Sequence, residues 1–304
     1  MASNDSLAGR SRSTQPAGSA GTIHIGNQLE VNRMGYGAMR ITGRGIIGEP
    51  ADRSEAVRVL RRAVELGVEF IDTADSYGPH VSEEIIAQAL HPYPNDLVIA
   101  TKGGLERPGP NQWTPNGRPE HLRRALEGSL KRLKLERIDL WQLHRIDPKV
   151  PEGEQFGVLA EFVREGKVRF VGLSEVDVAA IKRAQRVVPI ASVQNRYNIV
   201  DRVWDAVVDY CDKHCLAFIP WFPLAAGAVD HDDEHRRTQE RIEKVARRHE
   251  ATPMQVALAW LLERSPQMLV IPGTSKVKHV EENIAAAELE LDDGDLELLS
   301  GHGH

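Results

Sequence analysis

The chain has 304 residues, a length that fits either one large α/β barrel or two average domains. Hydrophobic residues make up 41%, charged residues 27% and aromatic residues 5%, which excludes disordered and fibrous proteins. The formal net charge of −6 argues against a nucleic-acid partner held by a basic surface. No apolar run approaches the roughly 18 residues that span a bilayer, so we expect no membrane segment.

The first 20 residues are mostly small or polar and include few large apolar side chains. They cannot bury enough surface to offset the entropy of ordering, so we expect residues 1–20 to form a flexible tail and residues 21–304 one domain. The tail lacks the apolar segment of a secretory signal. Cys211 and Cys215 are too few for a disulfide framework or a zinc site, and we interpret them as packing thiols of a cytoplasmic protein.

From Thr22 onward, short apolar runs alternate with amphipathic stretches. The predicted strands are Met34–Met39, Glu69–Thr73, Leu97–Lys102, Ile138–His144, Val168–Ser174, Ile190–Gln194, Leu216–Trp221 and Met268–Pro272. The predicted helices are Ser54–Leu66, Ser82–Leu90, Pro119–Leu133, Phe156–Glu165, Val178–Val187, Val203–His214, Arg236–Arg264 with a break near Pro253, and Val277–Glu288.

These elements form eight strand–helix units, and the strands are continuous apolar runs, as expected when both faces of a parallel sheet are covered. A doubly wound sheet is the alternative, but it would carry a GxGxxG turn after an early strand, and none is present. We therefore predict the α/β class and a single (β/α)8 TIM barrel. The polar stretch Thr22–Glu30 precedes the first barrel strand and is predicted to form a hairpin that closes the barrel bottom.

Polar residues at the carboxyl ends of barrel strands point into the active site. Three consecutive predicted strands end at or beside Asp72, Lys102 and His144, and Tyr77 follows the second strand. Taken singly, each has an ordinary alternative: a helix cap for the aspartate, a solvated charge for the lysine and a core position for the histidine. Their convergence at neighbouring strand ends favours a common site.

These four residue types suit one kind of chemistry. A phenol with an ordinary pKa of about 10 is a poor acid at neutral pH, but an adjacent ammonium stabilises its phenolate and a carboxylate keeps that ammonium charged. Such a tyrosine can protonate a developing alkoxide, while a histidine hydrogen-bonds the same oxygen. Neither a nucleophile for acyl or phosphoryl transfer nor three clustered metal ligands accompany them. The set fits reduction of a carbonyl by an external hydride.

Several motifs resemble the aldo-keto reductase family: FIDTADSYG (70–78), ATKGG (100–104), LWQLH (140–144), VGLSE (171–175), SVQNRYN (192–198) and IPGTSKVKHVEEN (271–283). The resemblance implies that Asp72, Tyr77, Lys102 and His144 are the catalytic tetrad, with Tyr77 as proton donor. It also implies that NADPH binds without a Rossmann domain. Within the family, VNRMGYGAMR (31–40), YGPHV (77–81) and ATPMQVALAWLL (251–262) are most similar to a bacterial branch that includes pyridoxal reductases.

The same resemblance implies a set of cofactor-binding residues. Trp221 matches the aromatic residue that stacks on the nicotinamide, Ser174 and Gln194 match those that hold its carboxamide, and the segment from Pro223 to Gly227 matches the turn near the diphosphate. The implied residues are Ser174, Glu175, Gln194, Trp221, Pro223, Leu224, Gly227, Gly273, Thr274, Ser275, Lys276, His279, Glu282 and Asn283.

Two positions depart from the family pattern. Glu175 stands where many members have asparagine, and a carboxylate can accept from the carboxamide NH2 but cannot donate to its oxygen. His279 stands where many members place an arginine against the 2′-phosphate, which leaves Lys276 as the nearby cation. NADPH (NADP+) is the expected cofactor, and NADH stays open.

The expected partner is a small-molecule carbonyl compound. Pyridoxal is one hypothesis, with Arg40, His80, Trp113 and Arg145 expected near the barrel mouth, and a broad aldehyde or sugar-derived carbonyl range is the other. A nucleotide-binding regulatory barrel, similar to channel-associated β-subunits, is the alternative function. We interpret the acidic and histidine-rich run at 231–235 as a solvated loop, not a metal site. The sequence does not indicate the oligomeric state.

Overall fold

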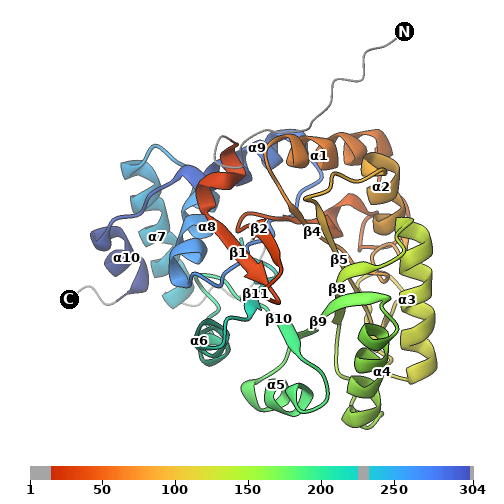
Figure 1. Ribbon diagram of the computed structural model, residues 1–304. Coiled ribbons are helices and arrows are strands. Elements are labelled where there is room, and N and C mark those ends of the chain that lie inside the picture. Colours follow the sequence, from red (N-terminus) through yellow and green to blue (C-terminus); the bar gives the residue numbers. More distant parts are fainter. Residues whose placement is uncertain (1–14, 225–232, 302–304) are drawn as a thin grey trace.

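The computed structural model describes residues 15–224 and 233–301. Seven parallel strands lie side by side in the order in which they follow each other along the chain, curled into a barrel with helices outside (Figure 1). They are β3 (Tyr36–Gly37), β4 (Phe70–Asp72), β5 (Val98–Gly103), β8 (Ile138–Leu143), β9 (Val168–Ser174), β10 (Ile190–Gln194) and β11 (Ala217–Phe218).

The predicted eighth strand closes the ring. Met268 bridges Phe218 of β11 and Val270 bridges Met34, both in parallel, and the main-chain N–H of Val270 donates to Arg33 O over 3.0 Å. These contacts are isolated bridges, so the segment is shorter in the structure than the predicted Met268–Pro272. The (β/α)8 barrel predicted from the sequence is confirmed.

Glycine allows the first and last strands to approach each other closely at this seam. A Cβ added to Gly37 would lie 2.7 Å from the main-chain oxygen of Ile271, and one added to Gly273 would lie 2.6 Å from that of Gly37. Such distances are shorter than any van der Waals contact, so larger residues at either position would push the seam apart.

The helices that surround the barrel are α1 (Arg53–Glu65), α2 (Val81–Leu90), α3 (Pro119–Leu133), α4 (Glu152–Arg164), α5 (Val178–Gln185), α6 (Asp205–Lys213), α7 (Asp233–Arg248), α8 (Pro253–Arg264), α9 (Val277–Ala285) and α10 (Asp293–Ser300). Helix α1 shows why they form: Asp52 caps its N-terminus by accepting from Glu55 N over 2.8 Å, and its buried residues recur at helical spacing. The expected break near Pro253 is confirmed, because Thr252 and Gln255 form a capping box that starts α8.

An antiparallel hairpin of β1 (Thr22–Ile25) and β2 (Leu29–Asn32) lies across the ring of strands (Figure 1). Its residues alternate between exposed and buried, and the buried ones join one apolar cluster with inward-facing barrel residues such as Phe70 and Leu140. The hairpin therefore fills the lower end of the barrel, as predicted, although it continues two residues past Glu30.

The predicted flexible tail of residues 1–20 includes a segment that is packed against the barrel. Pro16–Ala20 forms a 3-10 helix, the main-chain N–H of Ala17 donates to Leu66 O over 3.0 Å, and Ala17 is fully buried. Small alanine side chains fit a narrow gap against the barrel, so this segment packs without large apolar residues. Residues 1–14 lie outside the described part of the chain, as do Gly227 and the first two residues of the 231–235 run.

No helix in the described ranges is long and apolar enough to cross a membrane. Within those ranges, histidine, cysteine and carboxylate side chains also form no group of three that could hold a metal ion.

Candidate active site

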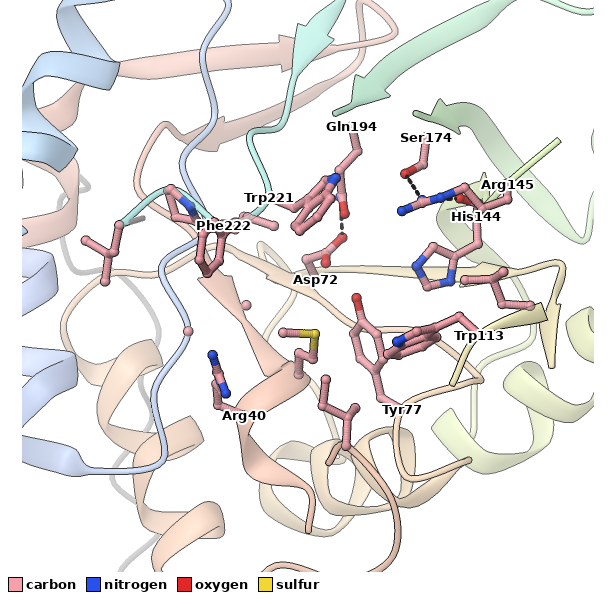
Figure 2. Close-up of a pocket in the computed structure, with 18 of the residues that line it drawn as sticks. Arg40, Asp72, Tyr77, Trp113, His144, Arg145, Ser174, Gln194, Trp221 and Phe222 are labelled. Atoms are coloured by element: carbon pink, nitrogen blue, oxygen red, sulfur yellow. Dashed lines mark hydrogen bonds between the residues drawn. The ribbon is translucent and has the colours of Figure 1, made fainter. Parts of the chain in front are cut away.

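The carboxyl ends of neighbouring strands bring four predicted residues together at the upper end of the barrel. Asp72 ends β4, Lys102 lies near the end of β5 and His144 directly follows β8, while Tyr77 lies in the turn after β4. All four are buried, and Figure 2 shows the Tyr77 hydroxyl pointing toward Asp72 with His144 beside it. The structure therefore gathers the whole predicted set in one place.

Lys102 is the centre of this group. Its Nζ donates to Asp72 Oδ1 over 2.6 Å, to the main-chain oxygen of Thr73 over 2.8 Å and to the Tyr77 hydroxyl over 3.3 Å. An ammonium has three donors, so each is used. With the lysine fully buried, this arrangement fixes the ammonium beside the phenol.

Burial and charge act in opposite directions on the two groups. Burial lowers the pKa of the Lys102 ammonium, but the charges of Asp72 and Tyr77 and the hydrogen bonds to both outweigh burial and leave that pKa above its ordinary value. Burial raises the pKa of the Tyr77 phenol, and the charge of Lys102 opposes the rise. Tyr77 is thus protonated at neutral pH, with a cation in position to stabilise its phenolate.

His144 is a neutral imidazole at neutral pH. Burial, followed by the positive charges of Lys102 and Arg145, holds its pKa well below the ordinary value. Its Nδ1 lies 3.4 Å from Ser76 Oγ, and its ring meets the Tyr77 ring edge to face at 5.9 Å between centroids. When the Ser76 hydroxyl donates to Nδ1, Nε2 carries the proton and acts as a donor.

Two glutamines hold Asp72 from the other side and were not among the predicted catalytic residues. Gln142 Nε2 and Gln194 Nε2 donate to Asp72 Oδ2 over 3.3 and 2.9 Å. Gln142 precedes His144 by two positions, and side chains two apart on a strand share a face. That alternation is a signal in the sequence that could have identified Gln142.

The four residues open onto a cavity of about 550 Å³. It is lined by Gly37, Met39, Arg40, Ile46, Asp72, Tyr77, Leu105, Trp113, Pro115, His144, Arg145, Ser174, Gln194, Trp221, Phe222, Pro223, Leu224, Ile271 and Gly273. Arg40, Trp113 and Arg145, which were expected near the mouth, line the cavity. His80 does not line the cavity, because it is an exposed residue at the N-terminus of α2.

Trp113 lines the cavity beside Tyr77 and His144. It precedes β7 (Thr114–Pro115), which pairs with β6 (Leu105–Glu106) in a hairpin that the sequence did not predict. The Arg107 guanidinium lies 3.6 Å from the Trp113 ring centroid and donates to Gly45 O over 2.8 Å. This stacking holds the indole edge to face with Tyr77, at 6.2 Å between centroids.

Arg145 connects two strand ends in the cavity wall. Its Nη1 donates to the main-chain oxygen of His144 over 2.6 Å and to Ser174 Oγ over 2.9 Å (Figure 2). Burial lowers the pKa of its guanidinium, but an arginine stays charged at neutral pH. The cavity therefore has a fixed positive charge near His144.

Glu175 hydrogen-bonds away from Asp72, Tyr77, Lys102 and His144. Its Oε1 accepts from Trp221 Nε1 and from the main-chain N–H of Arg196, both over 2.6 Å. Trp221 lines the cavity near Gln194 and Asp72 (Figure 2). The predicted cofactor residues Ser174, Gln194 and Trp221 are thus together in one wall, with Glu175 behind the tryptophan.

Pro223 and Leu224, which follow β11, also line the cavity, and the predicted cofactor residues from Gly273 to Asn283 lie where the chain enters α9 and within that helix. The main-chain oxygen of Thr274 accepts from the Tyr36 hydroxyl over 2.6 Å, and Thr274 Oγ1 accepts from Lys276 N over 3.2 Å and lies 3.4 Å from His279 Nδ1. The N-cap residue Lys276 gives no side-chain cap, but Glu55 Oε1 accepts from Val277 N, the first residue of α9, over 3.3 Å. Lys276 and His279 are exposed, while Asn283 is buried. Only Gly273 of this segment lines the cavity.

Comparison with known proteins gives matches along most of the chain. A sequence model of the Aldo/keto reductase family matches residues 33–303. An oxidoreductase of Schizosaccharomyces pombe, described as uncharacterized, is 50% identical over 275 residues, which are 90% of this chain and 87% of that protein. The pyridoxine 4-dehydrogenase of Escherichia coli is 41% identical over 294 residues, which are 93% of this chain and 98% of that protein.

The fold of a solved structure also matches this chain over most of its length. The aldo/keto reductase of Klebsiella pneumoniae in complex with NADP and acetate has a TM-score of 0.76 at 26% identity, over 92% of this chain and 94% of that chain. The fold of this chain therefore corresponds to that of the Klebsiella pneumoniae protein over nearly the whole length of both chains.

Proposed function

Since the chain belongs to the aldo/keto reductase family, we propose that it is an NADPH-dependent carbonyl reductase that converts an aldehyde or ketone to an alcohol. Membership makes it an NAD(P)H-dependent oxidoreductase that acts on small-molecule carbonyl compounds. The observation that carries the proposal is the buried chain of hydrogen bonds from Asp72 through Lys102 to the Tyr77 hydroxyl, at the base of the cavity.

The residues of the cavity fit a nicotinamide dinucleotide. The Trp221 ring offers a flat surface, and Ser174 and Gln194 beside it can hydrogen-bond a carboxamide. At the other end, the N-terminus of α9 presents main-chain N–H groups of the kind that bind phosphate, of which that of Val277 already donates to Glu55 Oε1 over 3.3 Å. When bound, the nicotinamide ring supplies the hydride that the carbonyl carbon accepts.

We assign the cofactor-binding role to Ser174, Gln194, Trp221, Pro223, Leu224, Gly227, Gly273, Thr274, Ser275, Lys276, His279, Glu282 and Asn283. NADPH is the expected form, because Lys276 provides a cation at the N-terminus of α9 for a 2′-phosphate. NADH is a weaker second cofactor in this proposal, because it lacks that phosphate.

Tyr77 gives its proton to the carbonyl oxygen as negative charge develops there. The resulting phenolate lies beside the Lys102 ammonium, which Asp72 keeps charged. His144 donates a hydrogen bond from Nε2 to the same oxygen, which orients the carbonyl and stabilises its charge. In the direction of alcohol oxidation, each proton transfer is reversed.

Pyridoxal is the substrate we propose first. It is an aromatic aldehyde with polar substituents, and the cavity offers the Trp113 ring and the Arg145 guanidinium on either side of His144. The Escherichia coli relative is named for an activity on pyridoxine, the corresponding alcohol. A broad range of other aldehydes is the second possibility, because substrate loops vary most within a fold.

The first experiment follows the loss of NADPH absorbance, with NADH in parallel, on pyridoxal, nitrobenzaldehyde, small aliphatic aldehydes and an aldose. Turnover of pyridoxal at low KM supports the proposal in full. Turnover of many aldehydes, each at high KM, supports only a general carbonyl reductase. Tight NADPH binding without turnover of any substrate would overturn the proposed activity and favour a regulatory nucleotide-binding barrel.

A further inference from the structure

We propose that Glu175 is a positioning residue that fixes the indole ring of Trp221, and that it does not bind the nicotinamide carboxamide itself. This inference rests on the proposed function, in which Trp221 is the surface against which the nicotinamide lies. Glu175 stands at a position where many relatives have asparagine, and this role would explain the difference.

Two short hydrogen bonds carry the inference. Glu175 Oε1 accepts from Trp221 Nε1 and from Arg196 N, each over 2.6 Å. A hydrogen bond to an ionised carboxylate is shorter and stronger than one between neutral groups. Both donors share one oxygen, so a carboxamide NH2 would have to compete with them for it.

The backbone around Glu175 holds its carboxylate in place. Glu175 has a φ of +57°, which a residue with a Cβ seldom adopts, and its N–H donates to Gln194 O over 3.1 Å. Arg196 forms a parallel bridge with Trp221, whose N–H donates to Asn195 O over 3.1 Å. The three segments that follow β9, β10 and β11 are therefore in contact around the Glu175 carboxylate.

The length of the side chain matters for this contact. Asparagine is one methylene shorter than glutamate and carries no charge, so an asparagine here would not reach the indole N–H with the same backbone. Among large aromatic side chains, phenylalanine offers the carboxylate no donor, whereas the indole of tryptophan offers its N–H. Glu175 and Trp221 thus form a matched pair in this chain.

The pair can first be tested without cofactor. The protein has five tryptophans, so labelling with 5-fluorotryptophan gives five ¹⁹F resonances, and Trp221→Phe identifies the one from Trp221. We expect that resonance to shift in Glu175→Gln and to shift and broaden in Glu175→Ala, with the other four unchanged. An unchanged Trp221 resonance in both variants would overturn the proposal.

The second test is a double-mutant cycle on the dissociation constant of NADPH, measured by titration calorimetry. We expect Glu175→Ala and Trp221→Phe each to weaken binding by about tenfold, and Glu175→Gln by about threefold because the amide oxygen still accepts. If Glu175 acts through the indole, the double variant Glu175→Ala/Trp221→Phe binds like Trp221→Phe alone. Independent losses that multiply to about a hundredfold would show direct contact with the cofactor and overturn the proposal.

A matched control removes another paired glutamate far from the cavity. Glu161 of α4 pairs with Arg123 of α3, and Glu161→Gln should leave both the Trp221 resonance and the NADPH dissociation constant unchanged. The two proposals fail in different ways. A wild-type protein that does not bind NADPH contradicts the proposed function, whereas the ¹⁹F spectra decide the Glu175–Trp221 contact in either case.

Discussion

The two ends of the proposed cofactor and substrate site are built differently. At the catalytic end, Asp72, Lys102 and Tyr77 are buried and hydrogen-bond one another. At the α9 end, Lys276 and His279 are exposed to solvent. The protein alone therefore sets the geometry of Asp72, Lys102 and Tyr77, whereas the side chains at the α9 end depend on a bound ligand for their contacts. Substitutions should therefore have large effects on rate at the first end and small effects on affinity at the second.

The largest effect is expected from Tyr77→Phe. Loss of the proton donor should reduce carbonyl turnover by about 10²- to 10⁴-fold, while the NADPH dissociation constant stays unchanged. Steady-state kinetics and titration calorimetry check the two parts. Tyr210→Phe is the matched control, because the Tyr210 hydroxyl bonds to Gln185 far from the cavity. Near-normal turnover in Tyr77→Phe would remove Tyr77 from the mechanism.

Lys102→Met should reduce turnover by about 10²-fold through loss of the charge beside the phenolate. It should also cost about 3–5 kcal/mol of unfolding free energy, because the buried Asp72 carboxylate loses its ionic partner. Urea denaturation measures the second effect. Lys167→Met, which breaks exposed pairs with Glu127 and Glu165, should cost about 1 kcal/mol or less. Equal losses in the two variants would contradict the contrast between buried and exposed pairs.

The pH profile of reduction should be flat across the neutral range. Burial raises the pKa of Tyr77, which must be protonated, so activity should fall only above its ordinary pKa of about 10. Burial and nearby cations lower the pKa of His144, which must be neutral, so the acidic fall should lie below about 6.5. On the acidic and on the alkaline side, log kcat should fall by one unit per pH unit, because one group titrates on each side. A midpoint near pH 7 would mean that another group controls turnover.

The smallest effect is expected at the α9 end. Lys276→Ala should raise the KM for NADPH by about two- to fivefold and leave the KM for NADH unchanged, because an exposed charge contributes about 1 kcal/mol or less. Lys131→Ala, which removes an exposed lysine of α3, is the control and should change neither. An equal rise for both cofactors would exclude Lys276 from recognition of the 2′-phosphate.

The catalytic end could be predicted from the sequence for a physical reason. Strands of a parallel barrel run in one direction, so residues at successive strand ends meet whatever the details of packing, and Asp72, Lys102 and His144 follow from that rule. Helix limits followed from periodicity and caps, and the predicted range Pro119–Leu133 is that of α3.

Contacts between loops could not be predicted in this way. The stacking of Arg107 on Trp113 depends on the path of the β6–β7 hairpin, whose two-residue strands are too short to give a periodic pattern. The Glu175–Trp221 hydrogen bond joins residues 46 positions apart, and only the closed barrel brings them together. The packed segment Pro16–Ala20 was missed because its buried residues are alanines, which composition does not distinguish from a tail.

The seam between the first and last strands has a consequence for synthesis on the ribosome. Arg33 donates to the main-chain oxygen of Met268, 235 positions later, and at 5–20 residues per second translation needs roughly 12 to 47 s to cover that distance. Throughout that interval, the edge of the nascent sheet that includes Gly35 and Gly37 has no strand to pair with. The emerging chain thus presents an open edge until the segment Met268–Pro272 has been made, and chaperones and proteases have access to that edge during this interval.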